Sequence, residues 1–471
     1  MSGIATTHPL YNKYAPYVQR TCDANDGEVQ KYIPRLTGQS NEQYEAYVNR
    51  SSYYNVVERT LSALVGALTR KESTIEGVVG DDPVFADGMH EDEFLTQCYR
   101  DMFKTGRVGI LVDYDDVKMT PYLTNYCGEH IINWGDGFVV LSEPYFAPNP
   151  KDPYEQLLLT RYRELFIDND GLYAVRLWEQ KKTTGGGYSA TKAVYEVVET
   201  IYPTVRGSRL DFIPFIVANA GGCGHEKIGK PPLSTLADIN IDHFKIAVDI
   251  GHGAHFIALP TPYIAGDLAS DTQMIRVGSD QFIHLSPGGQ VGYLEFSGAG
   301  MNFLMELQKA KEEQMFSLGS RMLQYKKGVE SSDSLQIRLG AEGASLIGIA
   351  TSLEEALSQA LYWYNLWMGQ DYEPDVELNK DVSPTVIDPQ QVQALLLLFQ
   401  KGVISLDTLL QRLYEGEIVD DPQEERELLT GEEEANENVE MAIEGPDSEE
   451  MDNTEEAMLS QSDAAVRSRA Q

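Results

Sequence analysis

Residues 231–259 read PPLSTLADINIDHFKIAVDIGHGAHFIAL and decide the fold. Their apolar residues recur every three or four positions, as in a helix, and the two prolines precede Ser234, which is available to cap it. The next segment, residues 260 to 296, contains the short β-type pieces TPYIAG, FIHLSP and VGYLEF, which are separated by Pro and Gly. A second long helix is expected from about Ala299 to Tyr325. The middle of the chain therefore predicts two helices with a small β insert between them.

The segments that follow are also helical by period. A polar break at Lys326 to Asp333 precedes a helix expected from about Leu335 to Met368. Further on, VQALLLLFQKGVISLDTLLQRLYEG predicts two helices joined at Gly402, with Ser405 placed as the N-cap of the second.

The first 230 residues mix helices with strands. Residues 41 to 71 predict one helix, or two joined near Ser51. A helix around Glu93 to Phe103 leads into the β-branched run VGILVDYDD, which is typical of a strand. From Tyr154 to Val198, three alternating segments separated by Gly-containing turns predict an antiparallel β-meander that continues toward Ile213 to Val217. The fold class is therefore α+β.

Length and charge bound the class of protein. The 471 residues, of which 42% are hydrophobic, suffice for two or three cores, and no run of apolar residues is long enough to span a membrane. We find no signal peptide and expect the chain to stay in the cytoplasm where it is made. The net charge is −36, and roughly half of it lies after Tyr414, in a tail expected to be disordered. This acidity argues against a protein that grips nucleic acid through many Lys and Arg contacts to phosphate.

Motifs for catalysis or cofactor binding are weak throughout. Gly224 to Lys230 match the spacing of a P-loop, but Pro231 stands where the motif needs a hydroxyl that binds magnesium. The four cysteines are scattered without metal-ligand spacing, so we expect reduced, mostly buried thiols and no disulfide or zinc site. We expect no cofactor, no bound metal and no catalytic residue.

Two clusters have both a functional and a structural interpretation. His243, His252 and His255 share the helix from Leu233 with three Asp residues, but their spacing fits no metal motif that we recognise, and polar contacts between subunits or plain surface are favoured. Four tyrosines, at positions 44, 47, 53 and 54, could stack on bases. They lack interleaved Lys or Arg, so a core or a subunit interface is the better interpretation.

Several segments, in order along nearly the whole chain, together resemble the portal proteins of tailed bacteriophages, in particular a widespread, mostly uncharacterised portal-like subgroup. The matching segments are RSSYYNVVERTLSALVGALTRK, GRVGILVDY, YCGEHIINW, PPLSTLADINIDHFKIAVD, LPTPYIAG, YLEFSGAGMNFLMELQKAKEEQMFSLGSRML, SLIGIATSLEEALSQALYWYNLWMG and LFQKGVISLDTLLQRL.

The resemblance implies an organisation for the whole chain. It implies a wing at 1–230, stem helices at 231–259 and 298–325, a clip at 260–297, a tunnel loop at 326–334, a tunnel helix and return to the wing at 335–385, a crown at 386–430 and a disordered acidic tail at 431–471.

The resemblance also implies a function and partners. Twelve copies would form a ring at one capsid vertex, through which double-stranded DNA is packaged and ejected. Its partners would be the terminase large subunit, the head-tail adaptor, the major capsid protein and scaffold, with no membrane partner, and its final location would be the virion. The long acidic tail departs from better-known portals.

Elementary geometry agrees with a large ring. If one helix per subunit lines a channel at a spacing of about 10 Å, twelve subunits give a ring about 38 Å across between helix axes and a hole of about 28 Å, whereas six leave about 9 Å. Only the larger ring admits a duplex. Such a ring uses heterologous contacts, so each subunit presents two different faces to its neighbours.

The acidic balance then suggests a mechanism. An acidic wall repels phosphates, so that DNA slides, while a few basic residues touch it near the constriction. The candidates are Lys326 and Lys327, with Lys309 and Lys311 on the stem as weaker ones. Lys326 and Lys327 are equally well explained as the solvated C-terminus of a helix.

Two other classes stay open at this point. One is another virion structural protein, such as a tail or adaptor component. The other is an acidic cytoplasmic enzyme with an unrecognised site. The helix, β insert and helix in mid-chain favour a non-enzymatic portal over both.

Overall fold

The computed structural model describes two units, Met1–Val382 and Ser383–Gln471, which we treat separately. The residues that it describes are 3–80, 84–115, 118–149, 152–181, 194–205, 207–224, 228–258, 261–265, 288–294, 299–320, 332–382, 389–415, 418–419, 421–423, 425–426 and 428–429.

Four helices precede the first sheet, and their ends carry recognisable caps. They are α1 (Pro9–Asp26), α2 (Asn41–Val48), α3 (Val56–Leu68) and α4 (Glu91–Thr105). Ser40 and Gln43 form a capping box at the start of α2, and the side chain of Asn55 accepts from the backbone N–H of Glu58 in α3. Residues 41 to 71 therefore form two helices, with the break at 49–55. The sequence analysis did not predict α1, which begins with Pro9 after the capping side chain of His8.

Two antiparallel sheets follow, and they confirm the α+β class. The first has the order β11-β2-β3, and the second has the order β4-β5-β6-β7-β8. The strands are β2 (Arg107–Asp115), β3 (Thr120–Cys127), β4 (Ile131–Gly135), β5 (Phe138–Asn149), β6 (Asp152–Ile167), β7 (Tyr173–Gln180), β8 (Tyr195–Ile201) and β11 (Phe215–Asn219). Two further pairs are small: β1 (Thr74–Glu76) with β14 (Asp375–Glu377), and β9 (Thr204–Val205) with β10 (Ser208–Arg209).

The predicted meander is confirmed for β6, β7 and β8, but its continuation to residues 213–217 is wrong. β11 pairs with β2 of the other sheet, with Phe215 opposite Leu111. Phe215 and Val217 are buried with Leu111, Trp134 and other residues from both sheets. The apolar face of β11 therefore belongs to the core between the sheets, and packing decides its partner.

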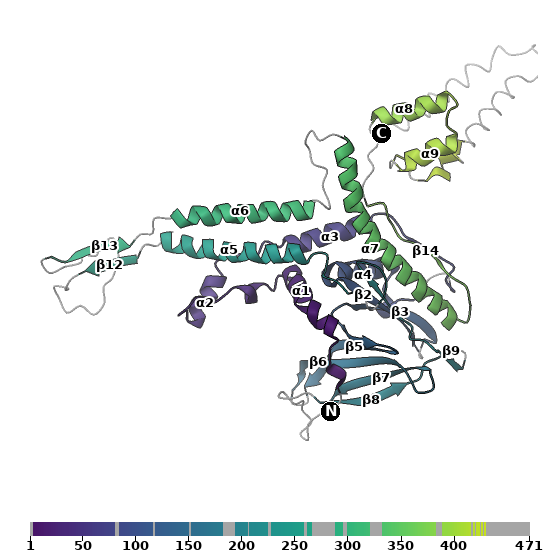
Figure 1. Ribbon diagram of the computed structural model, residues 1–471, viewed down its shortest axis with the longest axis horizontal. Helices are drawn as coiled ribbons and strands as arrows, with labels where there is room; N and C mark the ends of the chain where they lie inside the picture. Colours follow the sequence, from purple (N-terminus) through teal and green to yellow (C-terminus); the bar gives the residue numbers. More distant parts are fainter. Residues whose placement is uncertain are drawn as a thin grey trace, which may run out of the picture. The chain divides into compact units, whose positions relative to one another are not determined.

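The predicted helix, β insert and helix are all present (Figure 1). α5 (Ser234–Ala258) leads into β12 (Thr261–Ala265), which pairs antiparallel with β13 (Gln290–Leu294), and α6 (Ala299–Ser320) returns beside α5. Ser234 is the first helical residue and not the cap, because the carbonyl of Leu233 already accepts from the N–H of Ala237. The predicted piece FIHLSP lies outside the described residues, as do 321–325 at the expected end of the second helix.

The long helix α7 (Ser332–Trp367) completes the core of the first unit. It begins three residues earlier than predicted, so the last residues of the expected tunnel loop are helical, while 321–331 lie outside the described residues. Its buried residues recur at three and four and pack with α3, α4 and β2 in one continuous core; they are Leu346, Ile349, Ala350, Leu353, Ala356, Leu357, Ala360, Leu361, Tyr364 and Trp367.

The second unit contains two short helices, α8 (Pro389–Gln400) and α9 (Leu406–Glu415). Gly402 adopts a positive φ of 69° at the turn between them, and the Oγ of Ser405 accepts from the N–H of Thr408 at 3.2 Å. Both details confirm the predicted joint and cap. Residues 430–471, which include the expected acidic tail, lie outside the described residues.

Candidate functional site

The candidate site is the pair α5 and α6, the stem of the sequence analysis. α5 is held in place by its own chain: Leu236, Ile241, Phe244 and Val248 belong to the main core. Two glycines permit close packing at its far end. A Cβ on Gly251 would lie 2.9 Å from the carbonyl oxygen of Arg50, and α6 approaches so closely that a Cβ on Gly253 would lie 2.6 Å from the sulfur of Met301.

The acidic residues of α5 have partners within the same chain. Asp238 pairs with Arg20 of α1 at 3.3 Å, and Asp242 pairs with Lys311 of α6 at 3.4 Å. Asp249 accepts a hydrogen bond from the hydroxyl of Tyr47. These carboxylates therefore attach α5 to neighbouring elements, whereas the sequence analysis favoured contacts between subunits or plain surface.

The histidines of α5 show the same pattern. His243 is buried and lies 3.3 Å from Glu312 of α6, and the Nδ1 of His252 lies 2.7 Å from the guanidinium of Arg50. Among the residues that the structure describes, no group of three metal-ligating side chains comes together.

Three of the four tyrosines noted in the sequence are packed against the body. Tyr44 donates to the carbonyl oxygen of Ile33, and Tyr53 donates to the carbonyl oxygen of Ala24 at 3.0 Å. Tyr47 is buried, while Tyr54 is exposed. The core interpretation of these tyrosines is confirmed for the packed three.

α6 contacts α5 through one face only. Met315 is buried on this face, and Lys311 forms an ion pair with Asp242 at 3.4 Å. The residues that point the opposite way are polar; they recur at three and four and are Asn302, Glu306, Lys309 and Glu313. We call these four residues the polar ridge.

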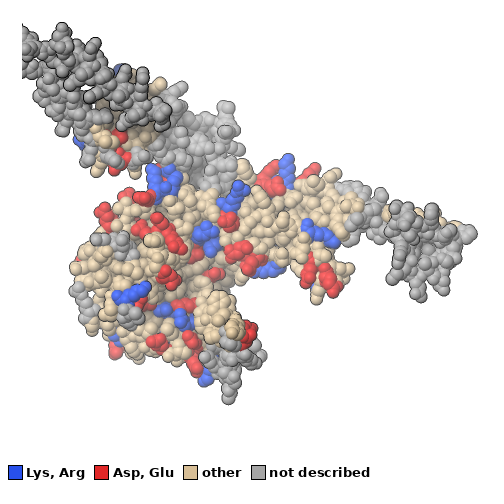
Figure 2. Space-filling view, turned by 180° about the vertical axis from the view of Figure 1, so that it is seen from behind, with Lys and Arg blue, Asp and Glu red and all other residues tan. Residues whose placement is uncertain are grey.

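Apolar side chains line both sides of the polar ridge. On one side Phe303 is 66% exposed and Leu307 is 36% exposed; on the other Met305 is 56% exposed and Phe316 is 54% exposed. We call these the two flanks of α6. In Figure 2 the surface over α5 and α6 carries only scattered acidic and basic side chains. Large apolar side chains that recur along one exposed helix are typical of a surface that another molecule covers.

The four candidate lysines fall in three different places. Lys326 and Lys327 lie outside the described residues. Lys311 points toward α5 and is paired with Asp242, so it is not on the polar ridge. Lys309 is exposed on the ridge between Glu306 and Glu313, and none of these three has an ion-pair partner among the described residues.

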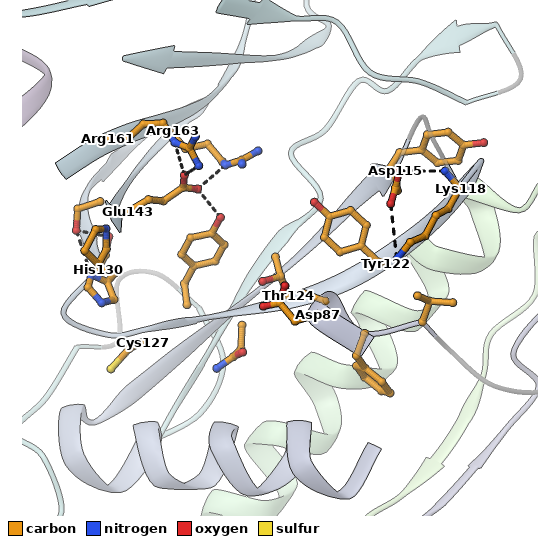
Figure 3. Close-up of a pocket in the computed structure, with 18 of the residues that line it drawn as sticks. Asp87, Asp115, Lys118, Tyr122, Thr124, Cys127, His130, Glu143, Arg161 and Arg163 are labelled. Atoms are coloured by element: carbon orange, nitrogen blue, oxygen red, sulfur yellow. Dashed lines mark hydrogen bonds and ion pairs between the residues drawn. The ribbon is translucent and has the colours of Figure 1, made fainter. Parts of the chain in front are cut away.

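A second feature is an open pocket of about 790 Å³ between the two sheets (Figure 3). Its wall holds an ion network that joins them: Glu143 of β5 accepts from Arg163 at 2.6 Å and from Arg161 at 2.9 Å. Arg163 also donates to Asp113 of β2 at 3.0 Å. The charges of the network therefore cancel one another and link the sheets.

The carboxylate at the centre of this network is held ionised. Burial raises the pKa of Glu143, but Arg163, Tyr126 and Arg161 more than offset this and hold it below the usual value of 4.5. A general acid or base would need a pKa near neutrality, so the network is suited to structure and not to proton transfer.

Other candidate chemical groups also have structural environments. Burial raises the pKa of the Cys22 thiol to about 12 and that of Cys98 well above its ordinary value, so neither is a nucleophile at neutral pH. Lys230, at the end of the P-loop-like segment, has its Nζ 4.2 Å from the centroid of the Tyr17 ring. Residues 225–227 of that segment lie outside the described residues.

Comparison with known proteins gives the following similarities. A family model described as a domain of unknown function (DUF4055) matches residues 232–368, which span α5 to α7. The chain is similar to a structure of the neck of the native GTA particle computed with C12 symmetry, with a TM-score of 0.40 and 11% identity over 77% of this chain and 89% of that one. No curated protein matches significantly.

Further similar structures come from related particles. One is the virion of the native gene transfer agent, with a TM-score of 0.38 and 10% identity over 82% of this chain and 94% of that one. Another is an HK97-family phage portal protein from Corynebacterium diphtheriae, with a TM-score of 0.30 and 13% identity over 69% of this chain and 92% of that one. Neck and portal structures are thus among those to which this chain is similar.

The exposed flanks of α6 were missed in the sequence analysis, although a signal for them was present. Phe303, Leu307 and Phe316 fall at positions that cannot all face one neighbouring helix, since a single buried face spans only part of the circumference.

Within the described residues, no helix is both long and apolar enough to cross a membrane.

Proposed function

We propose that this chain is a portal protein. Twelve copies form a closed ring, and double-stranded DNA passes through its centre during packaging and ejection. The protein carries out no covalent chemistry; a separate terminase supplies the energy, and the ring docks the terminase and later a head-tail adaptor. Its place is one vertex of the virion capsid.

The observation that carries this proposal is α6 with its two apolar flanks. A helix that packs on its own chain through one face and exposes apolar residues on both sides of a polar ridge suits a position between two neighbours. Full burial of an exposed Phe, Leu or Met side chain stabilises by about 1.5 to 3 kcal/mol, and each of the four flank residues, which are 36% to 66% exposed, would contribute part of this. The polar ridge is then left facing the lumen.

The charge of the ridge suits a surface along which DNA slides. Glu306 and Glu313 outnumber Lys309, so each subunit contributes a weakly acidic strip. An acidic strip does not form the many phosphate contacts that would hold DNA by counterion release. In this proposal Lys309 contacts the DNA phosphates transiently, whereas Lys311 holds α6 to α5 through Asp242.

The proposal is tested by the mass of the purified full chain, measured by native mass spectrometry over a range of salt concentrations. We expect a species of about twelve times the 52.5 kDa of one chain. A chain that stays monomeric or dimeric at every concentration and salt condition contradicts the proposal. Addition of a DNA duplex should leave this mass largely unchanged, because the ring surrounds DNA without binding it tightly.

A further inference from the structure

The strands β5 and β6 continue beyond the rest of their sheet. β4 pairs with β5 only over residues 138–141, and β7 pairs with β6 only over residues 162–167. The pairing of β5 with β6, however, extends outward through Glu143 opposite Arg161 to Pro148 opposite Gln156. Residues 143–149 and 152–161 thus form a two-stranded ribbon, which we call the arm.

The arm exposes large apolar side chains. Phe146 is 72% exposed and lies directly opposite Leu158, which is 65% exposed, so the two share one face of the ribbon. Tyr154 near the tip is 94% exposed. An isolated two-stranded hairpin is only marginally stable in water, and exposed apolar pairs add no stability until something covers them.

The described residues at the tip of the arm include two carboxylates. Asp152 and Glu155 lie there, and neither forms an ion pair with a Lys or Arg among the described residues; Glu155 accepts from the side chain of Asn149. The exposed surface of the arm therefore combines carboxylates with aromatic and aliphatic side chains, and a partner surface must complement both.

One surface of the same chain has the opposite charge. Along α1, the guanidinium of Arg20 lies 5.6 Å and the Nζ of Lys230 lies 4.2 Å from the ring centroid of the half-buried Tyr17. Lys13 lies one turn earlier, with its Nζ 5.1 Å from the ring of Tyr14. We call these five residues the basic face. It is notable in a chain of net charge −36, and only Arg20 of its three cations has a carboxylate partner, Asp238, among the described residues.

We propose that the arm of one copy packs onto the basic face of a neighbouring copy. The inference rests on the proposed ring, in which each subunit must present two different, mutually complementary surfaces. Phe146, Leu158 and Tyr154 cover the tyrosine rings, while Asp152 and Glu155 approach Lys13 and Lys230. Such charge pairing favours the correct register between neighbours, and the aromatic contacts supply the buried area.

The test is site-specific crosslinking in the assembled full chain. The photoreactive amino acid p-benzoylphenylalanine replaces Leu158, labelled and unlabelled copies are mixed before assembly, and crosslinked peptides are identified by mass spectrometry. We expect crosslinks between copies to the tryptic peptide Tyr14–Arg20. Crosslinks confined to one chain, or made between copies to any other surface, overturn the inference if the ring has formed. A chain that forms no ring refutes the proposed function itself, and the inference with it.

Charge reversal provides a second measurement that does not depend on the photoreactive residue. The double variant Asp152→Lys and Glu155→Lys places like charges opposite the basic face and should raise the concentration for half assembly about tenfold or more. Adding Lys13→Glu and Lys230→Glu to this double variant should bring the concentration for half assembly most of the way back to the wild-type value. The control Glu199→Lys, an exposed carboxylate on β8 of the same sheet, should change assembly little. Equal effects of the control and the double variant, or no rescue, contradict the arm contact.

Discussion

The helices α7 and α6 both carry large apolar side chains, but these side chains have opposite surroundings. Along α7, Leu353, Leu357 and Leu361 have no exposed surface, because strands and helices of the same chain cover them. Along α6, Phe303 and Phe316 are more than half exposed. The body around α7 therefore buries its apolar side chains within a single chain, whereas in the proposed ring the stem does so only when copies assemble. Substitutions in the two regions should separate stability from assembly.

The largest loss of stability is expected in the body. Leu357→Ala removes a fully buried side chain and should lower the free energy of unfolding by about 3 kcal/mol, because the cavity cannot close completely. Urea denaturation of the dissociated chain measures this. Ile347→Ala, at a partly exposed position of the same helix, is the matched control and should cost under about 1 kcal/mol. Equal losses would mean that α7 is not packed as described.

A somewhat smaller loss is expected from the ion network between the sheets. Glu143→Gln leaves Arg163 with a weaker partner and should cost about 2 kcal/mol near neutral pH. Because the folded pKa of Glu143 lies below the unfolded value near 4.5, its stabilisation is complete above that value and is lost as the pH falls through the folded pKa. The difference between the wild type and the variant should therefore be constant above about pH 5.5 and shrink below 4.5. A difference that is independent of pH down to pH 3 would contradict this assignment.

The two lysines of the stem should differ by a small amount. Lys311→Ala breaks the ion pair with Asp242 between α5 and α6 and should cost about 0.5 kcal/mol, since both groups are partly solvated. Lys309→Ala should leave the free energy of unfolding unchanged. Thermal unfolding in low and high salt distinguishes them, because only the Lys311 effect should decrease with screening. A salt-dependent loss at Lys309 would place that residue in a structural contact instead.

The smallest effect on the stability of the single chain is expected where the effect on assembly is greatest. Phe303→Ser combined with Phe316→Ser should change the free energy of unfolding of the dissociated chain by no more than about 0.5 kcal/mol. The same variant should stay dissociated at concentrations at which the wild type forms rings, as followed by mass photometry. Glu306→Gln on the polar ridge is the control and should assemble normally. Normal assembly of the double Phe variant would show that the two flanks of α6 do not form the interface between copies.

Sequence patterns predicted the periodic elements well. The helix, β insert and helix of the stem and the cap at Ser405 follow from local signals: apolar spacing, Pro and Gly punctuation and a hydroxyl cap. For residues 41 to 71 the same signals left one helix or two open, and the structure shows two. The sheet to which β11 belongs could not be predicted, because its short apolar run is compatible with either sheet. The burial of Phe215 between the two sheets decides that β11 pairs with β2. The sequence analysis did not predict α1 because tyrosines, Pro16 and polar residues interrupt the apolar spacing of its sequence.

The candidate site was predictable only in outline. The acidic residues and histidines of α5 look like an open polar surface in the sequence, but Arg20, Tyr47 and Arg50, all distant in sequence, lie against them. Lys309 and Lys311 are two residues apart and so face different sides of one helix, a consequence of helical geometry that spacing alone could have shown. Which side faces α5 required the packing of Met315.

The most direct test of the central account is an electron cryo-microscopy reconstruction of the assembled full chain, preferably with a short DNA duplex present. The account predicts a closed ring in which Phe303 and Phe316 of each α6 contact the two neighbouring copies and the polar ridge of Asn302, Glu306, Lys309 and Glu313 lines a central channel wide enough for the duplex. A ring in which this ridge faces outward, or in which the flanks remain solvent-exposed, would contradict it.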